Sequence, residues 1–517
     1  MDFATVNLKL TKPNNYKKMK SINKLAVVAL LALASVGSAS ATTVNVIHVT
    51  GSTAFRVADV TAEVSYLNGL GSGGVTAAFV QAAPSLPSQP ADALTNTSTS
   101  VIYGPVVSGV QTVFENAFNG SIIGTEQATC NGSGNTPAEP KFMLASYWSS
   151  LATAVTVGNS TTPASGGYNP ASGSTSSYTY PGGSTENVQP DIAFADVFND
   201  AVQQIIGNFN TSYTQNLTPS GTTASQVVGI IPFVFVCTGS TDVTSKLSGL
   251  DMDPQKFTQL WNNGTLPLSF FTGSTGDSTI TAYALGRDVD SGTRGTALME
   301  TGFGLNGSGN AAINNEVTQY FPYDNSTDAN NDQSSSTGTG TYVSKGEVGD
   351  SSAPVIGYMN PVPPDAVGGY SMPEGDGGYN SGGNLAIAFC TPFSGLTNTA
   401  LFTYLGVFDA QNALAVSSNK PFLMSYNGVT FNPTVGAGVP ANVQAIESGK
   451  YTFWGYEHMF TTTSSSAPSV TAAAQLKSLL LGGLDQLASA GVPIASMQVE
   501  RTDDGEPVTK IVGTNPY

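Results

Sequence analysis

A strand–turn–helix unit around Arg287 is the feature that most limits the folds open to this chain. An apolar run from Ile280 to Leu285 leads into Arg287-Asp288-Val289-Asp290-Ser291-Gly292-Thr293-Arg294, and a helix-forming segment follows from Gly295 to Glu300. A Gly-containing turn between a strand and a helix directs several backbone N–H groups toward one point, with the positive end of the helix dipole behind them. The unit therefore predicts an α/β arrangement, and it predicts a place where an anion can bind.

Two interpretations of this turn are open from the residues alone. A serine before a helix commonly accepts a hydrogen bond from the first helical turn, so the turn can be a cap with nothing bound. Alternatively, hydroxyl, N–H and guanidinium donors surround a tetrahedral oxyanion. The donors of such a site are Arg287, Ser291, Gly292 and Thr293. Asp290 adds a negative charge here, which disfavours an anion unless the carboxylate points away or caps the helix.

Further strand–turn–helix units are predicted at residues 44–66 and 142–155. Small polar or acidic residues lie in their turns or end a further short strand, namely Ser52, Thr53, Ser149, Ser150 and Asp196. Each can be an ordinary cap or turn residue, and Arg287 can make a surface ion pair. In α/β folds, however, ligands bind beyond the carboxyl ends of strands, where these residues are expected to meet. Other predicted elements are strands at 191–196, 227–236, 355–358 and 385–390 and helices at 253–261, 401–414 and 472–490.

The first 41 residues are predicted to be a secretory signal. An apolar run from Leu25 to Val36 ends before a small-residue cleavage site, Ala39-Ser40-Ala41, and follows a basic stretch with Lys17, Lys18, Lys20 and Lys24. This run is too short to be read as a membrane span, and no later apolar stretch reaches spanning length. The remaining chain is therefore expected in the periplasm or outside the cell, without stable insertion in a membrane.

The charge of the chain argues against one broad class of partner. Cleavage after residue 41 removes six of 18 Lys and Arg and one of 35 Asp and Glu, which leaves 12 basic and 34 acidic residues and a formal charge of −22. A chain this acidic is not expected to bind nucleic acid through its phosphates. Any anion site must use oriented local donors, because the field of the whole protein repels anions.

No sequence pattern typical of a hydrolase or a metal centre is present. G-x-S-x-G, H-E-x-x-H and Walker A motifs do not occur. His48 and His458 have no metal ligand or Ser or Asp partner at helical spacing, so a core or structural role is expected for both. Cys130, Cys237 and Cys390 match no metal spacing. Cys237 is expected to be a buried thiol, and one disulfide after export is also open. We therefore expect no catalytic residue, metal or cofactor.

The polar turns, taken in order, resemble those of the PstS-like periplasmic phosphate-binding proteins, the two-lobed solute-binding proteins of ABC uptake systems. Arg287-x-x-x-Ser291-Gly292-Thr293 is similar to the R-x-D-G-S-G-T motif of that family, in which the Arg, Ser, Gly and Thr donate to phosphate. Val289 and Asp290 stand where the family has Asp and Gly. These two differences bear more on which ligand binds than on which fold the chain adopts.

The resemblance implies roles for the other polar turns. Thr50-Gly51-Ser52-Thr53 is similar to the first phosphate loop of the family, with either Ser52 or Thr53 as the donor. Ser149 or Ser150 is the implied counterpart of the serine at the start of the second helix. Asp196 is similar to the Asp that accepts the proton of phosphate.

The resemblance also implies the domain organisation. We expect an α/β fold of two lobes, with mixed, mostly parallel sheets flanked by helices and a ligand cleft between the lobes. The first lobe is expected to take residues 42–228 and 415–517, and the second residues 229–414. The 476 residues that follow the signal are enough for two cores. Large insertions are expected near 156–186 and 306–350.

Three functions are compatible with this fold. The resemblance implies a non-enzymatic solute-binding protein that binds phosphate, or a similar oxyanion, and delivers it to an ABC permease. A surface or envelope structural protein is an alternative, favoured by the long insertions rich in Gly, Ser and Thr and by the low charged fraction, 10%. The third is a secreted phosphatase on the same fold, because relatives of the family have been associated with that activity.

Overall fold

The computed structural model describes residues 42–80, 94, 97–129, 140–155, 180–197, 227–303, 316–324, 355–364, 373–415, 419–433, 443–462, 465–482 and 491–514. The predicted secretory signal, Cys130 and most of both predicted insertions lie outside these ranges. Within them, helices and strands are interspersed along the chain, and the predicted α/β class is confirmed.

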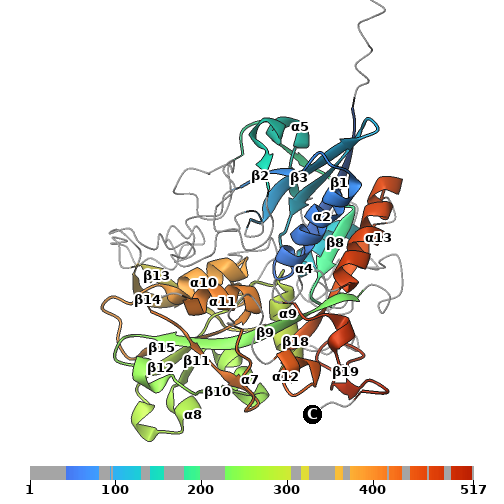
Figure 1. Ribbon diagram of the computed structural model, residues 1–517. Helices are drawn as coiled ribbons and strands as arrows, with labels where there is room; N and C mark the ends of the chain where they lie inside the picture. The colour runs from blue at the N-terminus through green and yellow to red at the C-terminus, as the bar shows by residue number, and fades with distance from the viewer. Residues whose placement is uncertain are drawn as a thin grey trace, which may run out of the picture.

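One mixed sheet of 12 strands runs through the described part of the protein (Figure 1). Eleven strands follow the order β11-β12-β15-β9-β18-β8-β1-β4-β3-β2-β6, and β16 pairs with β9 outside this path. The strands are β1 (Thr43–Gly51), β2 (Thr76–Phe79), β3 (Thr99–Val107), β4 (Val110–Ala117), β6 (Thr153–Ala154), β8 (Ile192–Ala195), β9 (Val227–Gly239), β11 (Thr265–Pro267), β12 (Thr281–Ala284), β15 (Thr399–Gly406), β16 (Phe422–Leu423) and β18 (Trp454–Thr461).

The pairing in this sheet is mixed, as predicted, but parallel pairs are the minority. β1 pairs in parallel with β4 and β8, and β12 pairs in parallel with β15. The other neighbours in the described sheet are antiparallel; a short turn joins β3 directly to β4, whereas pairs such as β9 with β15 and β18 join strands distant in the sequence. Four two-stranded sheets lie outside it in the described residues. Three are antiparallel: β5 (Lys141–Met143) with β7 (Thr185–Asn187), β13 (Tyr320–Asp324) with β14 (Ile356–Pro361), and β19 (Val499–Glu500) with β20 (Thr509–Lys510). The fourth, β10 (Asp251–Met252) with β17 (Ser425–Tyr426), is parallel.

Strand β9 connects two parts of the sheet. Its first half pairs with β18 and its second half with β15, so that it runs from the side of β1 and β8 to the side of β12 (Figure 1). All but the first of its 13 residues are buried, which explains its nearly unbroken apolar sequence. Pro232, which has no N–H to donate, lies where the pairing changes from β18 to β15.

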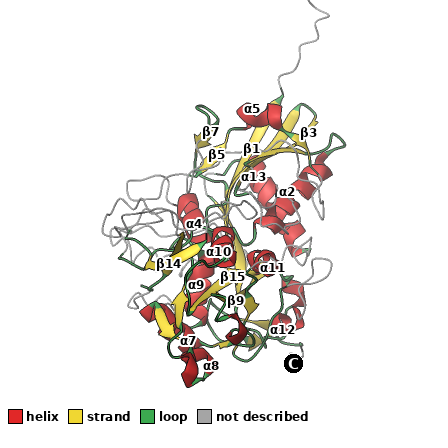
Figure 2. Ribbon diagram, turned by 90° about the vertical axis from the view of Figure 1, so that its left-hand side faces the viewer, coloured by secondary structure: helices red, strands yellow, loops and turns green. Residues whose placement is uncertain are grey.

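The helices flank this sheet (Figures 1 and 2). α2 and α13 pack against each other beside β1, and α10 and α11 pack against each other beside β15. The helices are α2 (Arg56–Leu70), α4 (Ser121–Thr129), α5 (Ala145–Trp148), α7 (Pro254–Asn263), α8 (Ser269–Thr272), α9 (Gly292–Glu300), α10 (Gly382–Cys390), α11 (Val407–Ala415), α12 (Val443–Glu447) and α13 (Ala467–Leu481), with short 3₁₀ turns at 149–151, 244–246, 275–277 and 494–496.

Helix α7 confirms the element predicted at 253–261. The Asp253 side chain accepts a hydrogen bond from the N–H of Lys256, and Pro254 occupies the first turn, where its missing N–H costs nothing. Gly264 ends the helix in the left-handed conformation at φ 74°. Each of these signals is local, which is why the sequence was sufficient here.

Two elements were predicted with the wrong type. Residues 385–390 form part of helix α10 instead of a strand, and residues 399–406 form strand β15 before helix α11 begins at Val407. A short apolar run has no clear period, so its type is decided by its surroundings. The Ser381 side chain caps α10 by accepting from the N–H of Asn384, and β15 pairs on both edges, with β12 and β9.

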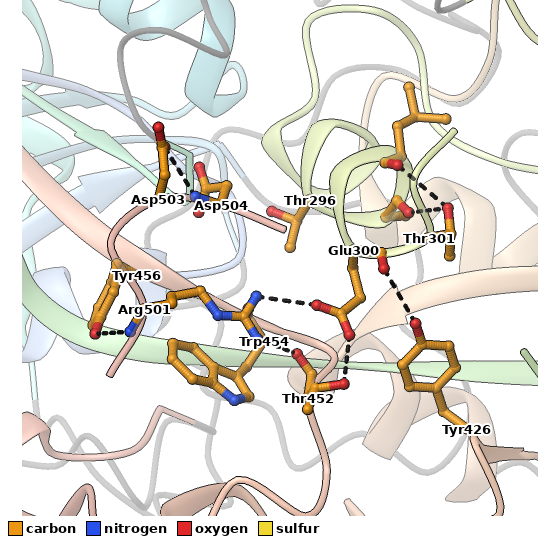
Figure 3. Close-up of polar contacts among 12 residues, drawn as sticks. Thr296, Glu300, Thr301, Tyr426, Thr452, Trp454, Tyr456, Arg501, Asp503 and Asp504 are labelled. Atoms are coloured by element: carbon orange, nitrogen blue, oxygen red, sulfur yellow. Dashed lines mark hydrogen bonds and ion pairs between the residues drawn. The ribbon is translucent and has the colours of Figure 1, made fainter. Parts of the chain in front are cut away.

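The C-terminal segment is attached to helix α9 by a buried ion pair (Figure 3). Nη1 of Arg501 lies 3.0 Å from Oε2 of Glu300, the last residue of α9. The guanidinium lies 4.0 Å from the ring centroid of Trp454 in β18. The far end of α9 is thereby fixed to the edge of the central strands.

The predicted buried thiol is confirmed. Cys237 in β9 and Cys390 in α10 are buried and free. Among the described residues, no helix combines the length and the apolar character needed to cross a bilayer.

Candidate functional site

The starts of two helices meet at the buried carboxyl of Asp196. Asp196 directly follows β8 and is 1% exposed. One of its oxygens, Oδ1, accepts a short hydrogen bond from Oγ of Ser121, the first residue of α4, and Oδ2 accepts from Oγ1 of Thr293, in the first turn of α9, at 3.4 Å. Figures 1 and 2 both place α4 and α9 side by side at the middle of the molecule. Positive helix ends and hydroxyl donors therefore point at one buried acidic group.

Gly292 is required where α9 begins. A Cβ at this position would overlap Oδ1 of Asp196 and lie 2.7 Å from Cβ of Ser121. Only a residue without a side chain allows the helix start to approach the carboxyl this closely. Ser291 is the cap of the helix, because its Oγ accepts from the N–H of Arg294 at 3.3 Å. The cap interpretation is therefore confirmed for Ser291, and the same turn also lies against the buried carboxyl of Asp196.

Arg287 is held rigidly beside this turn. Its guanidinium is not at the surface, since the residue is 3% exposed. Nε donates to the carbonyl of Tyr379 at 3.0 Å, and Nη2 donates to the carbonyl of Asn380 at 3.1 Å. Burial raises the pKa of Asp196, while the hydrogen bond from Ser121 and the charge of Arg287 act in the opposite direction. The positive charge of Arg287 therefore acts on the same carboxyl as the two helix ends.

A second arginine positions the segment that holds Arg287. Nη2 of Arg294 lies 2.5 Å from Oδ1 of Asp376, and Nη1 donates to the Asp376 carbonyl at 2.5 Å. The N–H of Val317 donates to the same Oδ1 at 2.9 Å. These contacts fix the chain just before Tyr379, whose carbonyl holds Arg287. Arg294 and Asp376 were not predicted, because their partnership depends on residues 82 positions apart.

The carboxyls of Asp288 and Asp290 are buried beside the turn, and burial raises the pKa of each. Burial raises the pKa of Asp288 to about 6, with Arg287 and Arg294 opposing the change. The pKa of Asp290 lies well above its usual value because of burial and the nearby charges of Asp288 and Glu126. Asp290 does not cap α9, since Ser291 does. The raised pKa of Asp290 reduces the negative charge that its carboxyl places beside an anion.

The first predicted loop also reaches this region. β1 and β8 are parallel neighbours up to Gly51 and Phe194, and the N–H of Ser52 donates to the carbonyl of Phe194 at 2.8 Å. Ser52 is fully buried, and its Oγ accepts from the N–H of Phe55 at 3.2 Å, which shapes the turn into α2. Thr53 is half-buried in the same turn. The loop therefore lies next to the strand end that carries Asp196.

Ser149 and Ser150 do not lie with the other predicted residues. Both are exposed in a 3₁₀ turn that follows α5, and α5 lies at the far end of the molecule from α9 (Figures 1 and 2). The polar turn after Phe142 is joined to two very short strands and not to a long helix. Ser121 occupies the position expected for these serines. Its signal was the order of apolar strand, Asn119-Gly120-Ser121 and helix, which matches the unit at Arg287.

Further buried carboxyls lie behind Asp196. Burial raises the pKa of Glu457 well above its usual value, and the carboxyls of Asp196 and Asp59 add to the effect. Burial does the same for Asp59 and Glu63 in α2, and Asp59 raises the pKa of Glu63 further. Nδ2 of Asn116 donates to Oε2 of Glu63 at 2.8 Å. Acids whose pKa values are raised by burial therefore extend from the site into the part of the sheet formed by β1, β4 and β18.

These acids predict that the protein becomes more stable as the pH falls from about 7.5 to about 5. Asp59, Glu63, Glu457 and Asp290 have higher pKa values in the folded protein than in the unfolded chain, so the folded protein keeps their protons to a higher pH. The stability that these groups contribute is then greatest below their pKa values in the unfolded chain, and it is lost as the pH rises through their pKa values in the folded protein. Burial lowers the pKa of His458 to about 3, and this residue opposes the trend below its usual value of 6.5. Urea midpoints across this range test the prediction; a midpoint that falls steadily toward acid would contradict it.

Comparison with known proteins gives distant structural similarity. No protein-family model and no curated protein matches the chain. The chain is similar to a "putative phosphate ABC transporter substrate-binding protein with bound phosphate" from Clostridium perfringens, with TM-score 0.36 and 8% identity over 87% of this chain and 100% of that one. It is also similar to an "ABC-type phosphate transport receptor" from Vibrio cholerae, with TM-score 0.29 and 7% identity over 59% of this chain and 80% of that one. A third similar structure is a "possible phosphate binding protein" from Planctomyces limnophilus, with TM-score 0.31 and 11% identity over 88% of this chain and 95% of that one. Each TM-score is below 0.5, so these similarities decide nothing about the site.

Proposed function

We propose that this protein is an exported solute-binding protein that binds phosphate, or a similar tetrahedral oxyanion, beside Asp196 and delivers it to an ABC transporter. One observation carries the proposal: the starts of α4 and α9 and the rigid guanidinium of Arg287 act on one buried carboxyl. Such donors favour an anion without a basic surface patch, which this acidic chain lacks the residues to build.

The site offers many donors and one acceptor, as a dehydrated hydrogen phosphate requires. The proposed donors are Ser52 or Thr53, Ser121, Arg287, Ser291, Gly292 and Thr293. Asp196 is the proposed acceptor of the proton of HPO₄²⁻. Oγ of Ser121 and Oγ1 of Thr293, which donate to Asp196, would turn to the ligand as it enters. Sulfate carries no proton at neutral pH, so it would face the carboxylate without a hydrogen bond between them.

The proposed donors come from both predicted lobes. We propose that residues 42–228 and 415–517 form one lobe, which supplies Ser52, Thr53, Ser121 and Asp196. Residues 229–414 would form the other lobe, which supplies Arg287 and the Ser-Gly-Thr turn. Strand β9, which pairs with strands of both lobes, supports this division. Ligand contacts across the boundary would couple binding to closure and exclude water.

Calorimetric titration with phosphate and with sulfate tests the proposal. The protein is first unfolded and refolded, so that ligand carried through purification is removed. Tight binding of one phosphate and weak binding of sulfate are expected. Absence of heat with both anions, in protein shown to be folded by circular dichroism, would reject oxyanion binding and favour the structural alternative.

Replacing the acceptor should change the preference between the two anions. In Asp196→Asn the proton of phosphate loses a charged acceptor, and we expect phosphate affinity to fall about 10- to 100-fold. Sulfate affinity should rise, because the amide can donate to an unprotonated oxygen and the like charge is gone. Ser150→Ala, at an exposed serine outside the site, is the matched control and should bind as the wild type does. Equal losses of affinity for phosphate and sulfate would show that Asp196 does not distinguish the two anions by the proton of phosphate.

A further inference from the structure

Four titratable side chains from different strands gather at His48, away from the site described above. His48 lies in β1, where its register partner on β4 is Glu115. On the other side, Asp191 directly precedes β8, and its N–H donates to the carbonyl of His48 at 2.9 Å. Glu186 comes from β7, which pairs with β5. Parallel strands thus place His48 between two acids, and a third acid approaches from the small β5–β7 sheet.

The donor atoms of this cluster are spaced as metal ligands are. Nε2 of His48 lies 3.3 Å from Oε1 of Glu186 and 3.5 Å from Oε2 of Glu115. One ligand atom from each of the three residues can be chosen so that all lie within 4.8 Å of one another. Two ligands that are each about 2.1 Å from a tetrahedral metal lie about 3.4 Å apart. Small adjustments of these side chains would therefore suffice to surround one ion.

Asp191 fixes the imidazole in the orientation that a metal needs. Oδ2 of Asp191 lies 3.3 Å from Nδ1 of His48 and accepts from the backbone N–H of the same residue at 3.0 Å. A carboxylate on Nδ1 keeps the proton there and leaves the lone pair of Nε2 free. Histidine ligands of metals almost always donate their other ring N–H to a carboxylate, a backbone carbonyl or a water. Nε2 is the atom that points toward Glu115 and Glu186.

The charge of the cluster favours a divalent cation. Glu115 has a fully buried side chain; its Oε1 accepts from the N–H of Ala145 at 2.7 Å, whereas its Oε2 makes no hydrogen bond. In the described part of the chain, His48 is the ion-pair partner of all three acids, and no Lys or Arg joins them. One imidazolium among three carboxylates leaves a net charge of −2, which is costly where solvent is limited. A divalent ion with neutral His48 leaves −1 and gives the free oxygen of Glu115 a partner.

We propose that His48, Glu115 and Glu186 bind one divalent transition-metal ion, with Asp191 orienting His48. One imidazole nitrogen and carboxylate oxygens suit Zn²⁺ better than Ca²⁺ or Mg²⁺, which prefer oxygen ligands alone. The ion would fasten β7 to β1 and β4. His48 precedes Ser52 by four residues of extended chain, or about 13 Å, so this site is separate from Asp196 and does not depend on the proposed function.

A proton on Nε2 is the competing occupant. Burial lowers the pKa of His48, but Asp191, Glu115 and Glu186 together raise it to about 10. Imidazolium and metal are distinguished by titrating tag-free, chelator-treated protein with Zn²⁺ by calorimetry and with Co²⁺ by its visible absorption. We expect one Zn²⁺ per chain, a higher melting temperature with the ion, and the Co²⁺ spectrum of a site with one nitrogen ligand.

Two conservative variants and one control make the test specific. Glu186→Gln removes a half-exposed ligand and should weaken Zn²⁺ at least about tenfold, and Asp191→Asn should weaken it about 10- to 100-fold by releasing the ring. Glu500→Gln, at an exposed acid of β19, removes the same charge elsewhere and should leave binding unchanged. Wild-type protein that binds no Zn²⁺, or binds it no more tightly than Glu186→Gln does, would overturn the proposal and leave His48 as a protonated ion-pair partner.

Discussion

Arg287→Ala is expected to weaken phosphate binding about 100- to 1,000-fold. The side chain is 3% exposed, and carbonyls of Tyr379 and Asn380 hold it in one orientation before any ligand arrives. A donor that is already fixed loses little entropy on binding, so most of its charge–charge attraction appears as affinity. Loss of a buried, hydrogen-bonded charge costs an interface about 2–5 kcal/mol, and the expected loss, about 2.7–4.1 kcal/mol, lies within that range.

Two further variants separate geometry from charge. Arg287→Lys keeps the charge but cannot reach both carbonyls and a ligand at once, so we expect an intermediate loss. Lys510→Ala removes one positive charge from an exposed position and should bind as the wild type does. Calorimetric titration of the three proteins with phosphate gives the comparison. If Arg287→Ala binds within a few-fold of the wild type while its circular dichroism is unchanged, the ligand does not lie beside Arg287.

Local signals explain what the sequence predicted correctly. The Ser-Gly-Thr turn was found because strand, turn and helix are adjacent in the chain, and Asp196 was found because it ends an apolar run. Both lie at one place in the structure, with Thr293 donating to the carboxyl of Asp196. Helix α7 carried its own cap, proline and terminal glycine within 12 residues of sequence.

Features that depend on pairing between distant residues were not predictable. Ser149 and Ser121 both follow apolar segments, and only the packing of α4 against β8 selects Ser121. The type of the run 385–390 was likewise set by the cap at Ser381 and not by its period. His48 was expected to be a core residue because helical spacing showed no partner. Its partners are acids 67 to 143 positions away, which sheet register brings together.

The buried Arg501–Glu300 pair should contribute strongly to stability. We expect Arg501→Met to lower the free energy of unfolding by about 3–5 kcal/mol, because it leaves Glu300 buried without its charged partner. The side chains of Arg501 and Glu300 are 1% and 7% exposed. Nη2 of Arg501 also donates to the carbonyl of Thr452 at 2.8 Å, and the guanidinium lies on the Trp454 ring (Figure 3). Urea unfolding followed by circular dichroism measures the loss.

The sign of the pH effect identifies the cause of this loss. Burial raises the pKa of Glu300, and Arg501 is the largest influence that lowers it. Without Arg501 the carboxyl protonates at a higher pH, so the loss in Arg501→Met should shrink as the pH falls toward about 5. Glu300→Gln added to Arg501→Met removes the buried charge and should recover part of the loss.

Lys246→Met breaks a pair whose lysine is 38% exposed and should cost no more than about 1 kcal/mol. If Arg501→Met loses no more stability than Lys246→Met does, packing and not the ion pair holds the end of α9. A loss of the expected size would show that the ion pair anchors α9 at the end opposite to Gly292 and Thr293.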